Sequence, residues 1–255
     1  MTDQEWAVLD PLLPDPDWAT CDGGRPEKHC RRQVVDAILY VLDNGIKWRA
    51  LPGDFPPWQT VYSLFRRWEG QGASEDILDT LRDRARLAAG RQAAPSAAVI
   101  DSASVKGAPT VGAPTRGYDA GKKVSGRKRH IAVDTMGLLL CVLVTPADVQ
   151  DRDGAKPLLG LLAAAGTRLR LVWADGGYAG KLVAWCRQAT GLVLSIVKRT
   201  EQHKFVVLPR RWVVERTLAW VARHRRCAKD YEMLPECHEA WVRWSQIRIL
   251  LKRLE

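Results

Sequence analysis

Near residue 96 the hydrophobic pattern changes from helical periodicity to short apolar runs that are typical of strands. Five such runs are bounded by turn residues and predict strands at 97–101, 130–135, 138–145, 169–175 and 192–198. Three later segments have helical spacing and predict helices at 153–165, 178–189 and 210–226. The resulting order is a strand, a hairpin of two strands, and then helices alternating with strands. This order predicts a mixed sheet with helices packed on it.

The first 92 residues have a different pattern and predict a helical region. A helix capped by Asp3 is expected to end at Leu13, before two prolines. Further helices are expected at 31–44, ending at Asn44-Gly45, from Thr60 to 72, and at 74–89. We therefore predict an α/β chain of two domains: a helical domain over 1–92 and a mixed α/β domain over 93–255. Arg66 and Arg67 would suit DNA contact by a helix-turn-helix-like reader.

The charge balance points to a polyanionic partner. Thirty-nine Lys and Arg against twenty-nine Asp and Glu give a net charge of +10, for which nucleic acid is the simplest partner. No apolar run approaches the roughly 18 residues of a membrane span, and the N-terminus lacks an apolar signal core. We therefore expect a cytoplasmic protein with no membrane partner. The six cysteines are spaced too widely for a zinc knuckle and are expected to be reduced thiols.

Two acids follow predicted strands. Asp101 ends the run AAVID, and Asp175 ends LRLVWAD before Gly176-Gly177. In open α/β sheets, ligands bind at the edge formed by the carboxyl ends of the strands, and carboxylates there could hold a hard cation. The alternative is that each aspartate caps the turn or helix that follows it.

A third acid, Glu215, lies in an otherwise apolar and basic helix. Because much of this helix is expected to face the core, the carboxylate needs a partner to offset the cost of burial. Arg211 and Arg216 could pair with it. A divalent metal is the alternative, since two such ions can activate a hydroxyl and stabilise a leaving oxygen in phosphodiester chemistry. The strand order and the three acids together fit a ribonuclease-H-like nucleotidyl-transfer core.

Five segments make a resemblance specific: 45–68, VIDSASVKG at 99–107, GRKRHIAVDTMGLLL at 126–140, WADGGYAG at 173–180, and RRWVVERTLAWVARHRR at 210–226. Together they resemble bacterial insertion-sequence transposases of the DDE type, in the insertion-sequence-five group. The resemblance implies that Asp101, Asp175 and Glu215 are the catalytic triad and bind Mg²⁺ or Mn²⁺. It also implies cleavage at the ends of an element and joining of the 3′-hydroxyl to target DNA. The implied partners are the terminal inverted repeats, target DNA and further copies of the chain.

The chain departs from this group in the signature around the glutamate. Arg211 occupies the Arg position, but Leu208 replaces the Tyr and Ala222 replaces the Lys. We expect Arg223, one position beyond Ala222, to take over the role of the Lys.

Basic residues suggest where DNA lies. The segment from Lys106 to Arg129 is predicted to be a long mobile loop beside Asp101, and long loops in compact domains are usually functional. Its predicted phosphate contacts are Lys106, Lys122, Lys123, Arg127, Lys128 and Arg129. The alternative is a solvated, charged loop. The late helix is expected to add Arg211, Arg216 and Arg223, with Trp212 and Trp220 in the core.

Two other functions remain open from the residues. One is a metal-dependent nuclease that cuts DNA without joining it. The other is a non-catalytic DNA-binding remnant or repressor, against which the complete set of three acids argues.

Overall fold

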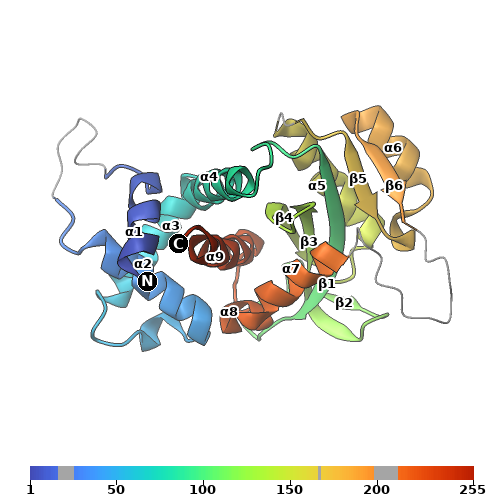
Figure 1. Cartoon of the computed structure of the whole chain (residues 1–255). Coiled ribbons are helices and arrows are strands. Elements are labelled where there is room, and N and C mark those ends of the chain that lie inside the picture. The colour runs from blue at the N-terminus through green and yellow to red at the C-terminus, as the bar shows by residue number, and fades with distance from the viewer. Residues whose placement is uncertain (17–25, 166–167, 198–211) are drawn as a thin grey trace.

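The N-terminal part of the chain is helical. The computed structural model describes residues 1–16, 26–165, 168–197 and 212–255 (Figure 1). The first elements are α1 (Asp3–Leu9), η1 (Asp10–Leu12), α2 (Arg31–Asn44), η3 (Trp48–Ala50), α3 (Trp58–Gly70) and α4 (Ala73–Ala88). The cap of α1 is Thr2 rather than Asp3, because Thr2 and Glu5 form a reciprocal capping box. Helix α2 ends as predicted, at Gly45 in the left-handed conformation.

The second part alternates strands and helices. Its strands are β1 (Ala97–Lys106), β2 (Gly117–Asp119), β3 (Val124–Asp134), β4 (Leu139–Pro146), β5 (Leu171–Ala174) and β6 (Val193–Ile196). Its helices and short turns are η4 (Ala113–Thr115), α5 (Asp151–Ala164), η5 (Gly176–Tyr178), α6 (Lys181–Thr190), α7 (Trp212–Arg223), α8 (Arg225–Ala228) and α9 (Pro235–Leu254). All five predicted strands are present, whereas β2, α8 and α9 were not predicted.

The strands form one mixed sheet in the order β2-β3-β1-β5-β6, and β4 also pairs with β3. Strand β3 is antiparallel to β1 and β4, whereas β1, β5 and β6 are parallel to one another. The predicted hairpin turn at Met136-Gly137 is confirmed, and Gly137 has a φ of 79°. This sheet, with helices on both faces, is the predicted ribonuclease-H-like architecture.

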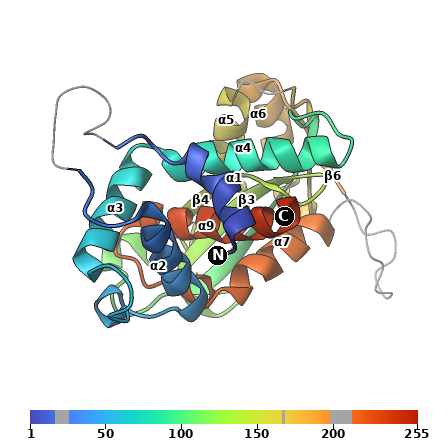
Figure 2. The same ribbon diagram turned by 60° about the vertical axis from the view of Figure 1, so that its left-hand side comes forward.

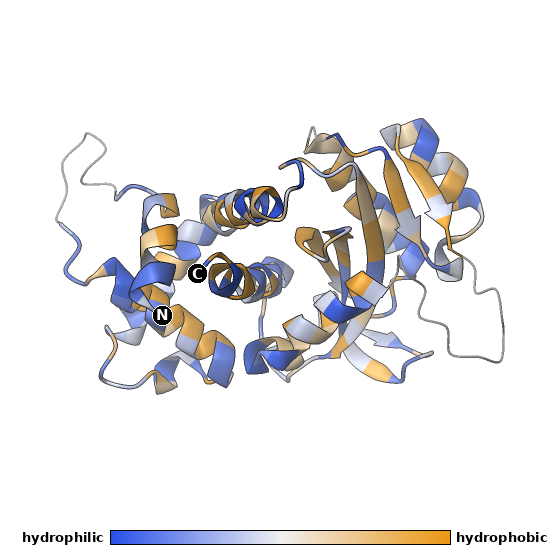
Figure 3. Ribbon diagram, in the orientation of Figure 1, coloured by the Kyte–Doolittle hydropathy of each residue, from blue (hydrophilic) through white to orange (hydrophobic). Residues whose placement is uncertain are grey.

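The two faces of the sheet are buried by different helices. Val99, Ile131 and Val133 pack in one core cluster with residues of α4, α7 and α9. Ala98, Ile100 and Ala132 pack in a second cluster with residues of α5 and α6. Successive side chains of a strand point to opposite faces, so the parity of a residue in β1 determines which helices it meets. Hydrophobic residues are concentrated along β5 and β6 (Figure 3).

Helix α9 lies between the N-terminal helices and the sheet. It packs against α4 and β4, as the two views agree (Figures 1 and 2), and Trp241 and Trp244 in it are fully buried. One hydrophobic cluster contains residues of α1 to α4, of the sheet and of α9. The interior is therefore continuous across the predicted boundary at residue 92, and the division into two domains stays a prediction.

The prediction of one long loop between residues 106 and 129 is wrong for residues 117–119 and 124–129, which are in strands, whereas 107–116 and 120–123 lie between strands. β1 continues to Lys106, and residues 117–119 and 124–134 form strands of the same sheet. Residues 104–106 of β1 pair with 126–128 of β3, which supplies the backbone hydrogen bonds that a loop would lack. Of the helices in the described part of the chain, none has the length and apolar composition of a membrane span.

Candidate active site

Asp101 lies in β1, and Asp175 directly follows β5, the neighbouring parallel strand. The register of β1 and β5 pairs Ala97 with Leu171 and Val99 with Trp173, two residues before each aspartate. Both carboxylates also act on the pKa of Tyr178, which places them near the same phenol. The sheet therefore brings the two predicted aspartates together, although Asp101 lies in the middle of β1 rather than at its end.

Both aspartates lie on the side of the sheet that α7 covers. Asp101 has the same parity in β1 as Val99, which packs with Val213 and Val214 of α7. Asp175 has the same parity as Trp173, which packs against the same cluster. Asp175 also caps η5, because its Oδ1 accepts a hydrogen bond of 2.8 Å from Gly177 N. The capping interpretation of Asp175 is thus confirmed.

A polar network lies beside the aspartates, on the α5 side of the sheet. Ser102 donates from Oγ to Asp151 Oδ1 at 2.8 Å, and Lys128 Nζ lies 2.9 Å from the same oxygen. Burial alone would raise the pKa of Asp151, but the hydrogen bonds from Lys128 and Ser102 outweigh it and lower the pKa. The network joins β1, β3 and α5 immediately next to Asp101.

Tyr178 extends this network towards both aspartates. Its side chain is buried and its hydroxyl is hydrogen-bonded to Ser102. Burial raises the pKa of Tyr178, and the carboxylates of Asp101, Asp151 and Asp175 raise it further. The phenol is therefore neutral and can donate a hydrogen bond. Sequence reasoning missed Ser102, Asp151 and Tyr178, although Ser102 directly follows Asp101 and Tyr178 lies three residues after Asp175.

Glu215 is exposed on α7, so the expectation of a buried carboxylate is wrong. The buried face of α7 consists of Val213, Val214, Thr217 and Val221, and Glu215 lies off this face. α7 packs on β1 and β3, and thus beside the aspartates. Within the described ranges, no three His, Cys, Asp or Glu side chains are grouped closely enough to hold a metal ion. The structure brings Asp101 and Asp175 together and leaves Glu215 on the neighbouring helix.

The three consecutive basic residues of β3 are buried, which corrects their predicted role as phosphate contacts. Arg127 is fully enclosed, and its Nη1 lies 3.0 Å from Asp230 Oδ2. The Lys128 ammonium donates to Val149 O at 2.8 Å, and Arg129 donates to Cys227 O at 3.0 Å. These side chains point into the interior, where protein acceptors bind the guanidinium of Arg127, the ammonium of Lys128 and Nη1 of Arg129.

Other predicted basic residues differ in their surroundings. Lys106, Lys122, Lys123 and Arg223 are exposed. Arg216 is partly buried and donates from Nη2 to Met136 O at 2.7 Å. Arg211 lies outside the described residues. The expectation that Trp212 is a core residue is wrong, since 39% of it is exposed.

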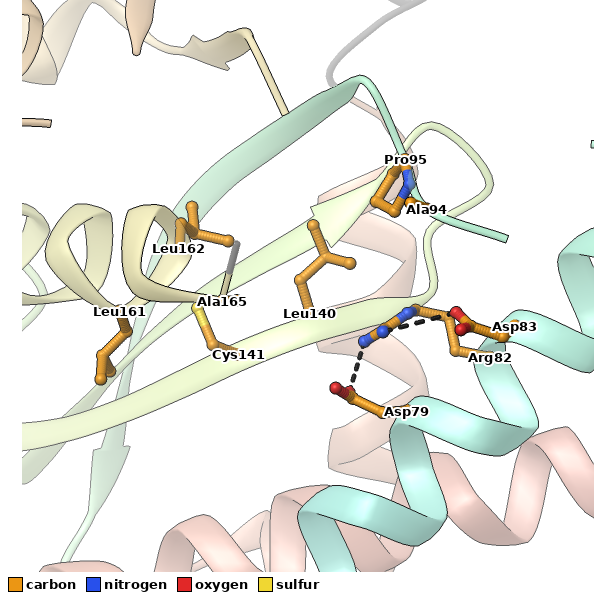
Figure 4. Close-up of a pocket in the computed structure, with 10 residues that line it drawn as sticks. All are labelled: Asp79, Arg82, Asp83, Ala94, Pro95, Leu140, Cys141, Leu161, Leu162 and Ala165. Atoms are coloured by element: carbon orange, nitrogen blue, oxygen red, sulfur yellow. Dashed lines mark hydrogen bonds and ion pairs between the residues drawn. The ribbon is translucent and has the colours of Figure 1, made fainter. Parts of the chain in front are cut away.

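A cavity elsewhere does not contribute to this site. It has a volume of 280 Å³ and is lined by residues of α4, β4 and α5 (Figure 4). Arg82 in its wall pairs with Asp79 and Asp83. Neither the two aspartates nor Glu215 lines it.

A ribonuclease-H-like sheet with one aspartate in β1 and a second directly after β5 matches the arrangement expected from the sequence. Comparison with known families is more specific. The family described as "Transposase DDE domain" matches residues 92–243, and "Putative transposase of IS4/5 family" matches residues 1–78. The chain belongs to the DDE transposase domain family.

Two relatives and one solved structure are similar to this chain. The "Putative transposase for insertion sequence element IS402" of Burkholderia cepacia is 33% identical over 48% of this chain. The matched region covers 65% of the length of that relative, which is less than two thirds. An "Insertion element IS402 uncharacterized 16.2 kDa protein" of the same organism is 30% identical over 39% of this chain and 67% of its own length. The Drosophila P element transposase strand transfer complex aligns with a TM-score of 0.34 and 14% identity, over 78% of this chain and 48% of that one.

Family membership implies dependence on a divalent metal. The aspartates fit such an ion, because carboxylate oxygens are hard donors and an ion of this kind is often bound by one or two carboxylates, with water and phosphate oxygens completing its shell. Asp101 in β1 and Asp175 directly after the parallel strand β5 provide these two carboxylates.

Proposed function

We propose that this chain is a DNA transposase that cleaves the phosphodiester at an element's end and then joins the released 3′-hydroxyl to target DNA. The observation that carries the proposal is the placement of Asp101 in β1 and of Asp175 directly after β5, the strand paired parallel to β1, with the helix of Glu215 packed on β1. The fold and the family match over residues 92–243 support the same activity. The DNA substrate would place the protein at the bacterial nucleoid.

In this proposal Asp101, Asp175 and Glu215 hold Mg²⁺ or Mn²⁺. When bound, such ions activate the attacking oxygen and stabilise the leaving oxygen in an in-line displacement. Asp101 and Asp175 are held by the sheet, whereas Glu215 approaches from α7. Both displacements occur at phosphorus without a covalent protein intermediate. Ser102 and Lys128 hold Asp151 beside this site, while the backbone N–H groups of Ser102 and Gly177 donate to Asp101 and Asp175 respectively.

The partner in this proposal is double-stranded DNA, both the terminal inverted repeats and the target. Exposed Lys106, Lys122, Lys123 and Arg223 are the described side chains that we propose as phosphate contacts. Since an element has two ends, we also propose that at least two copies of the chain act together on DNA.

The test replaces each metal-binding charge by an amide of similar size. Asp101→Asn, Asp175→Asn and Glu215→Gln are each expected to lower Mg²⁺-dependent cleavage at least about a thousandfold, because the metals carry the chemistry. The substrate is a plasmid that carries the gene with its genomic flanks. DNA binding should persist in all three variants. Asp54→Asn, an exposed aspartate outside the site, is the matched control. A near-normal rate in any one variant would exclude that residue as a ligand.

The same assay separates the alternatives. Strand-transfer products on a gel distinguish a transposase from a nuclease that only cuts. Binding without metal-dependent nicking would instead identify a DNA-binding remnant.

A further inference from the structure

Helix α7 is attached to the turn between β3 and β4 by two adjacent side chains. Arg216 donates from Nη2 to Met136 O at 2.7 Å. The buried hydroxyl of Thr217 donates to Gly137 O, also at 2.7 Å. Both acceptors are carbonyl oxygens of the same turn, and both donors directly follow Glu215 in the sequence. These contacts therefore set the position of the helix next to the predicted catalytic glutamate.

The turn that receives α7 is itself firmly held. Oδ1 of the buried Asp134 accepts hydrogen bonds of 2.8 Å from Met136 N and Leu138 N, and its other oxygen pairs with Arg86 of α4. Gly137 has a positive φ, and a Cβ there would lie 2.8 Å from Arg216 Nη2. The turn thus gives Arg216 a rigid docking point. A residue larger than glycine at position 137 would displace the Arg216 guanidinium from this point.

The guanidinium of Arg216 is also enclosed by aromatic rings. Its Cζ lies 4.3 Å from the ring centroid of Trp212 and 4.4 Å from that of Trp220. Arg253, near the end of α9, lies 4.9 Å from the Trp220 ring. Cation–π attraction to both rings holds the guanidinium against the helix. Arg216 is therefore a poor candidate for a mobile phosphate contact.

We propose that Arg216 is a positioning residue, which docks α7 on the β3–β4 turn and so fixes Glu215 relative to Asp101 and Asp175. This inference rests on the proposed function of Glu215. It replaces the expectation that Arg216 contacts DNA. It also explains the aromatic residues on either side of Arg216 in the helix: Trp212 and Trp220 hold the guanidinium on the turn.

The consequence for activity follows from geometry. A displacement of a catalytic group by about 1 Å can cost about a hundredfold in rate. Removal of the guanidinium would release the first turns of α7 from the sheet while the buried valines keep the helix folded. We therefore expect Arg216→Ala to lower the cleavage rate about a hundredfold and to leave the affinity for DNA within about twofold of wild type.

The experiment measures cleavage of the plasmid, DNA affinity and amide hydrogen exchange of residues 213–218 in the full chain. Arg216→Lys, which keeps the charge and one donor, should recover part of the rate. Arg84→Ala removes an exposed arginine from α4 and should leave rate and exchange unchanged. In the Glu215→Gln background, Arg216→Ala should cause no further loss, because it acts through the glutamate.

Three results would overturn the proposal. A normal cleavage rate in folded Arg216→Ala would show that positioning is not needed. A lower DNA affinity with a normal rate at saturation would make Arg216 a phosphate contact. Unchanged hydrogen exchange of residues 213–218 in Arg216→Ala would show that Arg216 does not hold the helix. The exchange measurement tests the docking role of Arg216 even if the wild-type protein does not cleave DNA. Absence of cleavage by wild type would contradict the proposed function and not the docking of α7.

Discussion

The two aspartates and the glutamate of the predicted triad are held in different ways. Asp101 is held in the paired strand β1, Asp175 caps the turn directly after β5, and a polar network around Ser102 and Asp151 lies next to Asp101. Glu215 is exposed on a helix that reaches the sheet through side-chain contacts. The positions of Asp101 and Asp175 (the aspartate side of the site) depend on the pairing of β1 and β5. The position of Glu215 (the glutamate side) depends on a few contacts that dock α7 and the residues after it.

This difference indicates which part of the site can move. A strand register is fixed by many backbone hydrogen bonds, so a single substitution cannot shift it. α7 is joined at one end to the β3–β4 turn through Arg216 and Thr217. After α8, Asp230 bonds through its backbone to Lys106 and Ala108 at the end of β1. Loss of either anchor should affect the glutamate before it affects the aspartates.

The largest effect on stability is expected at Asp230, the second attachment of the glutamate segment. Asp230→Asn keeps the shape but leaves Arg127 buried without its counter-charge, which typically costs about 3–5 kcal/mol. Denaturant unfolding measures this loss. Burial alone would raise the pKa of Asp230, but His238 and Arg127 outweigh it and lower the pKa. Asp230 therefore stabilises the fold above the unfolded pKa of about 3.9 and loses this contribution as the pH falls below it.

The exposed Asp54 supplies the matched control. Asp54→Asn should change the free energy of unfolding by less than about 0.5 kcal/mol. If Asp230→Asn were equally mild, the buried pair would not be an anchor of the glutamate segment.

A smaller effect on the free energy of unfolding is expected at His130, which lies beside the aspartates in β3. This residue pairs with Ser102 in register and is buried, and a Cβ on Gly154 would lie 2.2 Å from its ring. Burial lowers the pKa of His130 from 6.5 to about 4. Because the unfolded chain takes up the proton first, the free energy of unfolding should fall by about 3 kcal/mol as the pH drops from 6.5 towards 4.

The pH dependence of denaturant unfolding measures this contribution. Between pH 6.5 and 4, the slope of the free energy of unfolding against pH reports the protons taken up on unfolding. In His130→Gln this number should be about one proton smaller. His29→Gln, in the N-terminal region, serves as the control for loss of a histidine. An unchanged slope in His130→Gln would mean that the imidazole is protonated inside the fold.

The sequence predicted the aspartate side better than the glutamate side. Short apolar runs that end in Asp101 and Asp175 place two acids on neighbouring strands, because alternating strands and helices build a parallel pair. The length of β1 was missed, since residues 102–106 lack an apolar pattern and are held by pairing with β3. The position of Glu215 on its helix could not be predicted, because the docking of α7 depends on carbonyl groups of a distant turn.

Helix α9 and the basic strand show a second limit. α9 is buried on nearly every side and so lacks the polar face that identifies a helix at the surface. Arg127, Lys128 and Arg129 look like a phosphate-binding run in sequence, yet all three are buried. Only the acceptors contributed by distant segments, such as Asp230 and Cys227 O, determine that these cations face inwards.

The smallest expected effect concerns two cations outside both regions. Lys122 and Lys123 are exposed at the turn between β2 and β3. The double variant Lys122→Gln, Lys123→Gln should show a less steep dependence of log affinity for DNA on log salt concentration. The slope should decrease by about 0.9 for each DNA phosphate that the variant no longer neutralises. The free energy of unfolding should stay unchanged.

The control for this pair replaces two other exposed cations, Arg84 and Arg187, by Gln. This change lowers the net charge equally, so a general electrostatic effect would shift both slopes alike. A decrease confined to the Lys122 and Lys123 variant would mean that DNA lies along the β2–β3 turn. Equal decreases would instead mean that the positive charge of the whole chain attracts DNA and that this turn is only a solvated surface. Since neither lysine supports the aspartates or α7, the maximal cleavage rate at saturating DNA should stay normal in both variants.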